Sequence, residues 1–147
     1  MGAWAPGPGV VVLPDGRSVR GRGLRAPSPD GPDPELGVYL LARRPSVPAW
    51  QHRWVRWPDF ALPVSTRDAL AALREAHARA GDERVEVACA GGTGRTGTAL
   101  AVLAVLSGVP AGDAVDWVRA HYRPGAVETP WQRWWVRRAA DALGRHG

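Results

Sequence analysis

Short runs of hydrophobic residues, bounded by glycine, proline and aspartate, set the pattern along this chain. Runs of this length with β-branched residues, or with polar and apolar residues in alternation, are typical of β-strands. Pro14-Asp15-Gly16 joins the first two runs and predicts a tight turn, so the N-terminal part is expected to form a β-hairpin. The predicted strands lie at residues 10–13, 17–20, 38–41, 53–57 and 84–88.

Longer segments carry their hydrophobic residues at helical spacing. Ser65 stands three residues before Asp68, which is the spacing of a capping box, and Gly81 follows as a stop signal. The run 99–106 is apolar on every side, so its helix is expected to be central and buried. The predicted helices are 65–80, 99–106, 111–122 and 129–143.

Strands mixed with helices around one core predict an α/β fold. We expect a single domain with a central, mostly parallel or mixed sheet, flanked by helices. The 147 residues are enough for one such domain with a buried core. Residues 1–9 are rich in glycine and proline and are expected to be poorly ordered, so the domain itself is assigned to residues 10–147.

The composition indicates the cellular compartment in which the chain is expected to act. A membrane span is not expected, because the sequence has no apolar stretch of about 18 residues. The N-terminus has no basic segment followed by an apolar one, so no secretory signal is expected. Cys89 is the only cysteine and cannot form an internal disulfide. These features favour a cytoplasmic location. We also expect a monomer.

The net charge of +5 comes from arginine alone, since all 19 basic residues are arginine. A basic surface attracts phosphorylated molecules. No basic helix with base-reading side chains stands out, and no usual nucleic-acid module is recognisable, so nucleic acid is not the expected partner.

The segment from Cys89 to Thr96 carries the candidate chemistry. Cys89 and Arg95 are separated by five residues, three of them glycine. Glycines let the backbone bend so that its N–H groups converge on an anion, and arginine adds a planar fork that matches phosphate oxygens. The segment connects the strand 84–88 to a helix, and a helix N-terminus further favours an anion. The spacing therefore predicts an anion-binding loop with a thiolate at its base.

This segment resembles the phosphate-binding loop of the cysteine-dependent protein tyrosine phosphatases. Two more segments resemble loops of the same family, in the same order: Trp57-Pro58-Asp59-Phe60 its mobile acid loop, and residues 127–132 its glutamine loop. The resemblance spans residues 57–132 and implies a phosphatase of phosphotyrosine in proteins that forms a phosphocysteine intermediate. The short N-terminal part makes the chain similar to a compact, bacterial-type member with a role in signalling.

The resemblance also assigns roles to residues. Cys89 is expected to be the nucleophile, and Arg95 to bind two phosphate oxygens and the charge of the transition state. Thr96 is expected to hydrogen-bond the thiolate as it leaves. Asp59 is expected to be the general acid, carried by a loop that Trp57 anchors and Pro58 stiffens. The other residues expected to line the phosphate-binding loop are Ala90, Gly91, Gly92, Thr93 and Gly94.

The glutamine loop and the residue before the cysteine complete the predicted site. Gln132 is expected to orient the attacking water, whereas Glu128, where many members have glutamine, is interpreted as a structural residue of the loop. Ala88 replaces the histidine that usually precedes the cysteine in this family. No metal and no cofactor are expected, because no cluster of histidine and acidic residues has the spacing of a metal site. Inorganic phosphate and similar oxyanions are expected to bind.

Two other functions stay open at this level. A shallow pocket would also admit phosphoserine and phosphothreonine, which makes a dual-specificity phosphatase the first alternative. Phosphoinositides are disfavoured, because the interior of the loop has no basic side chain for additional phosphates. The alternative from another class is a phospho-binding module without turnover, against which the presence of Cys89, Asp59 and Arg95 argues.

Overall fold

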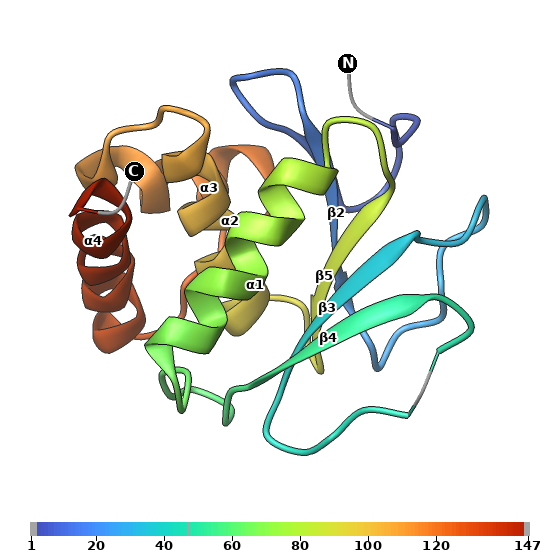
Figure 1. The fold of residues 1–147 in the computed structure, drawn as a ribbon, viewed down its shortest axis with the longest axis horizontal. Helices are drawn as coiled ribbons and strands as arrows, with labels where there is room; N and C mark the ends of the chain where they lie inside the picture. Colours follow the sequence, from blue (N-terminus) through green and yellow to red (C-terminus); the bar gives the residue numbers. More distant parts are fainter. Residues whose placement is uncertain (1–2, 47, 146–147) are drawn as a thin grey trace.

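A five-stranded sheet carries four α-helices on one side in this protein, seen here in a computed structural model that describes residues 3–46 and 48–145 (Figure 1). The strands are β1 (Val10–Val12), β2 (Ser18–Gly23), β3 (Leu36–Leu41), β4 (Gln51–Arg56) and β5 (Val85–Cys89). The helices are α1 (Thr66–Arg79), α2 (Gly94–Leu106), α3 (Ala114–His121) and α4 (Pro130–Arg145), with a 3₁₀ turn η1 (Ala111–Asp113) before α3.

The order of strands in the sheet is β1-β2-β5-β3-β4. β1 pairs with β2 in the antiparallel sense, whereas β2, β5, β3 and β4 run parallel to one another. The prediction of a mixed α/β sheet with an N-terminal hairpin is therefore confirmed. Parallel strands end at the same edge, and the loops after β4 and β5 leave the sheet together at its lower edge in Figure 1.

The two faces of the sheet differ in chemistry, as β5 shows. Val85, Val87 and Cys89 join the hydrophobic core, while Glu86 between them is fully buried on the other face. The Glu86 carboxylate accepts a hydrogen bond of 2.7 Å from Arg20, which compensates its charge. A buried charge is tolerated only when it is paired in this way.

The elements agree with the sequence pattern except at some of their ends. The Ser65 hydroxyl accepts a hydrogen bond from the Asp68 N–H at 3.1 Å, which confirms the predicted start of α1. α2 begins at Gly94, five residues before the apolar run, because its first turn is made of the motif itself. β2 continues to Gly23, beyond the predicted end of the strand at residue 20. The arginines in this part face the buried Glu86, so the hydrophobic residues that would indicate a strand are missing there.

Trp4 lies in the segment expected to be poorly ordered, of which residues 1 and 2 are outside the described residues. Its side chain is buried, and its indole N–H donates to the Val85 carbonyl at 2.8 Å. The Arg20 guanidinium lies 4.2 Å from the centre of the Trp4 ring. Trp4 therefore contacts the domain that was assigned to residues 10–147. No helix in the described part of the chain is long and apolar enough to cross a membrane.

Candidate active site

The loop between β5 and α2 is built around the sulfur of Cys89. Cys89 is the last residue of β5 and is buried. The Gly92 N–H donates to the Cys89 Sγ at 3.1 Å, so the loop curls back over the sulfur. α2 begins at Gly94, which directs the N-terminus of a 13-residue helix at the same space. A helix N-terminus there favours a bound anion.

Four consecutive carbonyls of this loop are held from outside. The Cys89 and Ala90 carbonyls accept hydrogen bonds of 2.9 and 3.0 Å from the N–H groups of Leu24 and Arg25, just beyond β2. Because N–H and C=O of a trans peptide point in opposite directions, outward carbonyls leave the next N–H groups on the inner side. The other two contacts are Arg123 to the Gly91 carbonyl at 3.1 Å and Tyr122 to the Gly92 carbonyl at 2.5 Å.

Gly92 cannot be replaced without moving the loop. Its φ is +77°, a left-handed conformation that only glycine adopts freely. A Cβ there would lie 2.5 Å from the Gly23 nitrogen, because the loop packs directly on the end of β2. Ala88, directly before Cys89, is buried and offers no side-chain donor to the loop. The loop carbonyls are held instead by residues just beyond β2 and at the end of α3.

Arg95 is buried with its guanidinium between the two predicted loops. One Nη donates to the Trp57 carbonyl at 3.0 Å, and the other lies 3.5 Å from an Asp59 carboxylate oxygen. Its buried Nε has no hydrogen-bond partner within residues 3–46 and 48–145. A buried N–H group without a partner is costly, and an oxyanion in the hollow beside it would satisfy it.

The acid loop is anchored by Trp57 and strained at Phe60. Trp57 is fully buried, donates its indole N–H to the Ala61 carbonyl at 2.8 Å, and meets the ring of Trp135 edge-on at 5.3 Å. Phe60 has a φ of +58°, which is uncommon outside glycine and costs free energy. Asp59 stands between them with a side chain that is 48% exposed.

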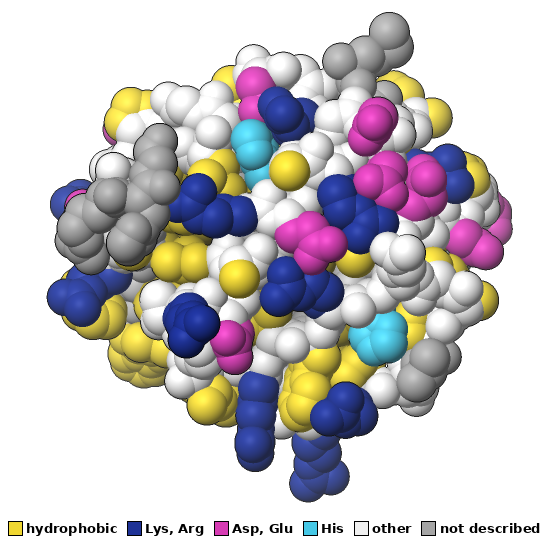
Figure 2. Space-filling model, in the orientation of Figure 1, with side chains coloured by type: hydrophobic (Ala, Val, Ile, Leu, Met, Phe, Trp, Pro, Cys, Tyr) yellow, Lys and Arg dark blue, Asp and Glu magenta, His cyan; other side chains and the backbone are white. Residues whose placement is uncertain are grey.

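One small hollow brings the predicted nucleophile, acid and phosphate clamp together. Its volume is about 100 Å³. Figure 2 shows arginine side chains along the lower edge of the molecule. The hollow is lined by Arg25, Asp59, Phe60, Cys89, Gly91, Thr93, Gly94, Arg95 and Glu128.

Thr96 lies in the first turn of α2, directly after Arg95. It is fully buried, and its hydroxyl has no hydrogen-bond partner among the described residues. The expected bond to the Cys89 sulfur is therefore not formed in this structure.

Gln132 and Glu128 occupy places other than those their predicted roles suggest. Gln132 is fully buried, and its side-chain oxygen accepts from the N–H groups of Glu128 and Thr129 at 2.9 and 3.2 Å. Gln132 thus caps the loop, and it is not among the residues that line the hollow. Glu128 lines the hollow instead, and a Cβ on Gly94 would lie 2.2 Å from its carboxylate.

Sequence reasoning missed the residues that support the loop from neighbouring elements. Arg25 lines the hollow, and Tyr122 and Arg123 hold the loop carbonyls. Burial raises the pKa of Tyr122 to about 12, so its hydroxyl remains a donor through the neutral range. The signal that leads to Arg25 is the parallel pairing of Gly23 with Cys89, which single-sequence patterns do not reveal.

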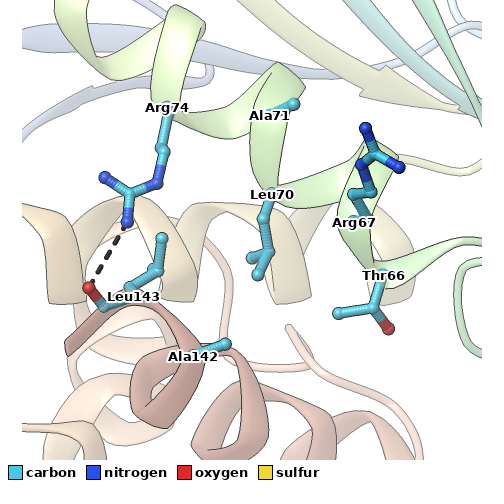
Figure 3. Close-up of a pocket in the computed structure, with 7 residues that line it drawn as sticks. All are labelled: Thr66, Arg67, Leu70, Ala71, Arg74, Ala142 and Leu143. Atoms are coloured by element: carbon cyan, nitrogen blue, oxygen red, sulfur yellow. Dashed lines mark hydrogen bonds between the residues drawn. The ribbon is translucent and has the colours of Figure 1, made fainter. Parts of the chain in front are cut away.

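A larger hollow of about 400 Å³ lies between α1 and α4, away from the predicted site residues (Figure 3). Arg74 from α1 crosses it and donates to the Leu143 carbonyl of α4 at 3.3 Å. No group of three or more histidine, cysteine or acidic side chains is placed to hold a metal ion within the described ranges.

Comparisons with known proteins identify the family of this chain. The family described as Protein-tyrosine phosphatase matches residues 41–140, more than half of the chain. Two uncharacterized proteins of Methanocaldococcus jannaschii are 35% and 33% identical over 102 residues. These matches cover 59% of this chain and 67% and 62% of the two relatives.

Solved structures of phosphatases share the fold. The crystal structure of Tk-PTP in the active form has a TM-score of 0.69 and 25% identity, covering 93% of this chain and 99% of that one. The tyrosine phosphatase TcPTP1 of Trypanosoma cruzi has a TM-score of 0.52 and 26% identity, over 63% of this chain and 34% of its own. The first of these spans nearly the whole of both chains.

Proposed function

Because the chain belongs to the protein tyrosine phosphatase family, we propose that it hydrolyses phosphotyrosine in proteins through a phosphocysteine intermediate, without metal or cofactor. The observation that carries the proposal is the convergence of Cys89, Asp59 and Arg95 on one hollow of about 100 Å³. A hollow of that size beside a buried guanidinium suits a tetrahedral oxyanion rather than a large ligand.

In the first step, the Cys89 thiolate attacks phosphorus, so a P–S bond forms while the P–O bond to tyrosine breaks. Asp59 gives its proton to the departing phenolate oxygen. Arg95 and the inner N–H groups of the loop hold the phosphoryl oxygens, on which negative charge develops. In the second step water attacks phosphorus, the P–S bond breaks, and Asp59 takes the proton from that water.

The buried residues behind the pocket have supporting parts in this proposal. Thr96 donates its hydroxyl to the sulfur as the thiolate leaves in the second step. Gln132 acts on the water through the loop that it caps, since its amide oxygen already accepts two backbone N–H groups. We place the reaction in the cytoplasm and in a monomer, with phosphoproteins and inorganic phosphate as ligands.

A dual-specificity phosphatase is the second candidate. Phe60 is the single aromatic side chain that lines the hollow in the described residues. One ring wall selects less strictly for phosphotyrosine than a slot between two rings would, so phosphoserine and phosphothreonine peptides have access.

The test is hydrolysis of a matched panel of phosphotyrosine, phosphoserine and phosphothreonine peptides, with and without a chelator. The proposal expects preference for phosphotyrosine, no effect of the chelator, and a phosphorylated enzyme intermediate trapped at Cys89. Comparable rates on all three peptides would instead support dual specificity. Cys89→Ser is expected to bind phosphate without turnover; if it turns over near the wild-type rate, the covalent mechanism is wrong.

A further inference from the structure

The exposed aromatic side chains of this protein gather at one place. Among the aromatic residues that the structure describes, three are exposed: Phe60 at 52%, Trp131 at 50% and Trp134 at 51%. Scattered exposed apolar residues are normal, but contiguous exposed aromatic surface marks an interaction site. Tryptophan in particular is enriched where binding free energy is concentrated.

These three residues follow one another from the hollow onto α4. Phe60 lines the hollow, and the Trp131 indole N–H donates a hydrogen bond to the Phe60 carbonyl. Trp134 lies three residues further along α4, on the same face of the helix. The Arg138 guanidinium lies 5.1 Å from the centre of the Trp134 ring and extends the surface. We name Phe60, Trp131, Trp134 and Arg138 the aromatic stripe.

The stripe is not needed for the core. The core-facing side of α4 consists of Trp135, Val136, Ala139 and Leu143, all buried. Figure 2 shows hydrophobic side chains interspersed with arginines over the lower part of α4. Because the opposite side of α4 already packs against the core, its two outward tryptophans leave an exposed apolar surface that a partner can contact.

We propose that the aromatic stripe docks the polypeptide segment next to the phosphorylated residue of a protein substrate. This rests on the proposed function, because a phosphorylated residue in the hollow places its own chain on the rim that Phe60 forms. Trp134 is one helical turn from Trp131, roughly 5 Å along the helix axis. Two or three residues of an extended peptide cover that distance. The stripe selects apolar or aromatic residues at those positions, and Arg138 favours an acidic residue beyond them.

Docking also bears on the acid loop. Trp131 contacts the carbonyl of Phe60, the residue after Asp59, so a peptide that packs on Trp131 stabilises the loop in the position that presents Asp59. Binding free energy from remote parts of a substrate is used in this way to complete a catalytic site. A docked peptide therefore raises kcat as well as lowering KM.

The experiment compares Trp134→Ala, Arg138→Ala and the matched control Arg137→Ala on three substrates. Arg137 and Arg138 are neighbours on α4 and both exposed, but only Arg138 belongs to the stripe. The substrates are a small aryl phosphate, a phosphotyrosine peptide with apolar flanks, and the same peptide with glycine and serine flanks. Wild-type turnover of the aryl phosphate tests the proposed function separately.

With Trp134→Ala, kcat/KM for the apolar peptide is expected to fall at least about fivefold. The aryl phosphate and the glycine-serine peptide are expected to change less than twofold. Arg138→Ala is expected to reduce kcat/KM for a fourth substrate, the apolar peptide with an added acidic residue beyond its apolar flank, and Arg137→Ala is not. Equal effects on all three substrates would overturn the proposal.

The stripe could instead contact a second copy of the chain or a membrane, and either result would also overturn the proposal. If the wild type is a dimer by sedimentation and Trp134→Ala is a monomer, the stripe is a contact between copies of the chain. If the wild type binds lipid vesicles without a phosphopeptide and Trp134→Ala does not, the stripe is a membrane contact. A monomer that leaves vesicles unbound and loses peptide selectivity on Trp134→Ala supports peptide docking.

Discussion

The guanidinium of Arg95 donates a hydrogen bond of 3.0 Å to the carbonyl of Trp57, which lies 38 residues earlier in the chain. This contact joins the predicted phosphate-binding loop to the predicted acid loop. It also holds Asp59 within 3.5 Å of the second Nη, so the acid stands over the hollow. In the proposed mechanism Arg95 therefore has two separable tasks, to bind the phosphoryl group and to position the acid loop.

Arg95→Lys is expected to lower kcat/KM for an aryl phosphate by roughly a hundred- to a thousandfold. Lysine is a point charge and cannot contact the Trp57 carbonyl and two phosphoryl oxygens at once. The measurement is steady-state kinetics, with Arg53→Lys as control, since Arg53 pairs with Glu75 at 2.9 Å on the surface. Arg95→Lys with most of its activity retained would show that Arg95 is not the clamp.

Asp59→Asn is expected to reduce hydrolysis of phosphotyrosine by roughly a hundred- to ten-thousandfold, and an activated aryl ester much less. A strongly basic leaving oxygen needs the proton, whereas an activated one does not. The measurement is steady-state kinetics of the wild type and Asp59→Asn on both substrates. Equal losses on both substrates would mean that another residue is the acid.

Local pattern was enough to predict most of the fold and the centre of the site. The strand 84–88, the glycine-rich segment and the helix after it are adjacent in sequence, so their order predicted where Cys89 and Arg95 meet. The pairing of β2 with β5 brings together residues 66 positions apart, such as Arg20 and Glu86, and no periodicity reports it. For that reason the sequence analysis did not predict that Arg25 lines the hollow.

The glutamine loop shows a second limit of sequence reasoning. Gln132 and Glu128 are four residues apart, and either can face the pocket, depending on one or two backbone angles. The structure gives Val127 a φ of +64°, an uncommon conformation for a β-branched residue that no propensity predicts. With that conformation the Glu128 side chain lines the hollow, and Gln132 is buried as the cap.

Glu128→Gln is expected to strengthen inhibition by inorganic phosphate several-fold at low salt, because a carboxylate beside the anion site repels the ligand. The effect is expected to shrink as salt is raised, since Glu128 is exposed and its charge is screened. The inhibition constant of phosphate, measured at two salt concentrations, checks this. Asp141→Asn on the exposed face of α4 changes the net charge equally and is the control; if it has the same effect, Glu128 acts only through overall charge.

Tyr122 and Tyr39 provide a matched pair of buried hydroxyls. The pKa of each is raised to about 12, chiefly by burial. Only Tyr122 touches the catalytic loop, through its 2.5 Å bond to the Gly92 carbonyl, whereas Tyr39 bonds to Glu86 on the far face of the sheet. Tyr122→Phe is expected to lower kcat about three- to tenfold, which corresponds to the roughly 0.5–1.5 kcal/mol of one hydrogen bond. Tyr39→Phe is expected to lower stability and leave kcat nearly unchanged.

The alkaline limit of stability tests the same two hydroxyls. A tyrosine with a pKa of 10 when unfolded and about 12 when folded binds its proton more tightly in the folded state. Its contribution to stability is therefore complete below pH 10 and is lost as the pH rises from 10 to 12. The free energy of unfolding of the wild type, measured in urea, is expected to decrease across that pH range. The decrease is expected to be less steep in each single Phe variant. If Tyr122→Phe shows the wild-type slope, its hydroxyl is not buried against the loop, and the support that it gives the Gly92 carbonyl is absent.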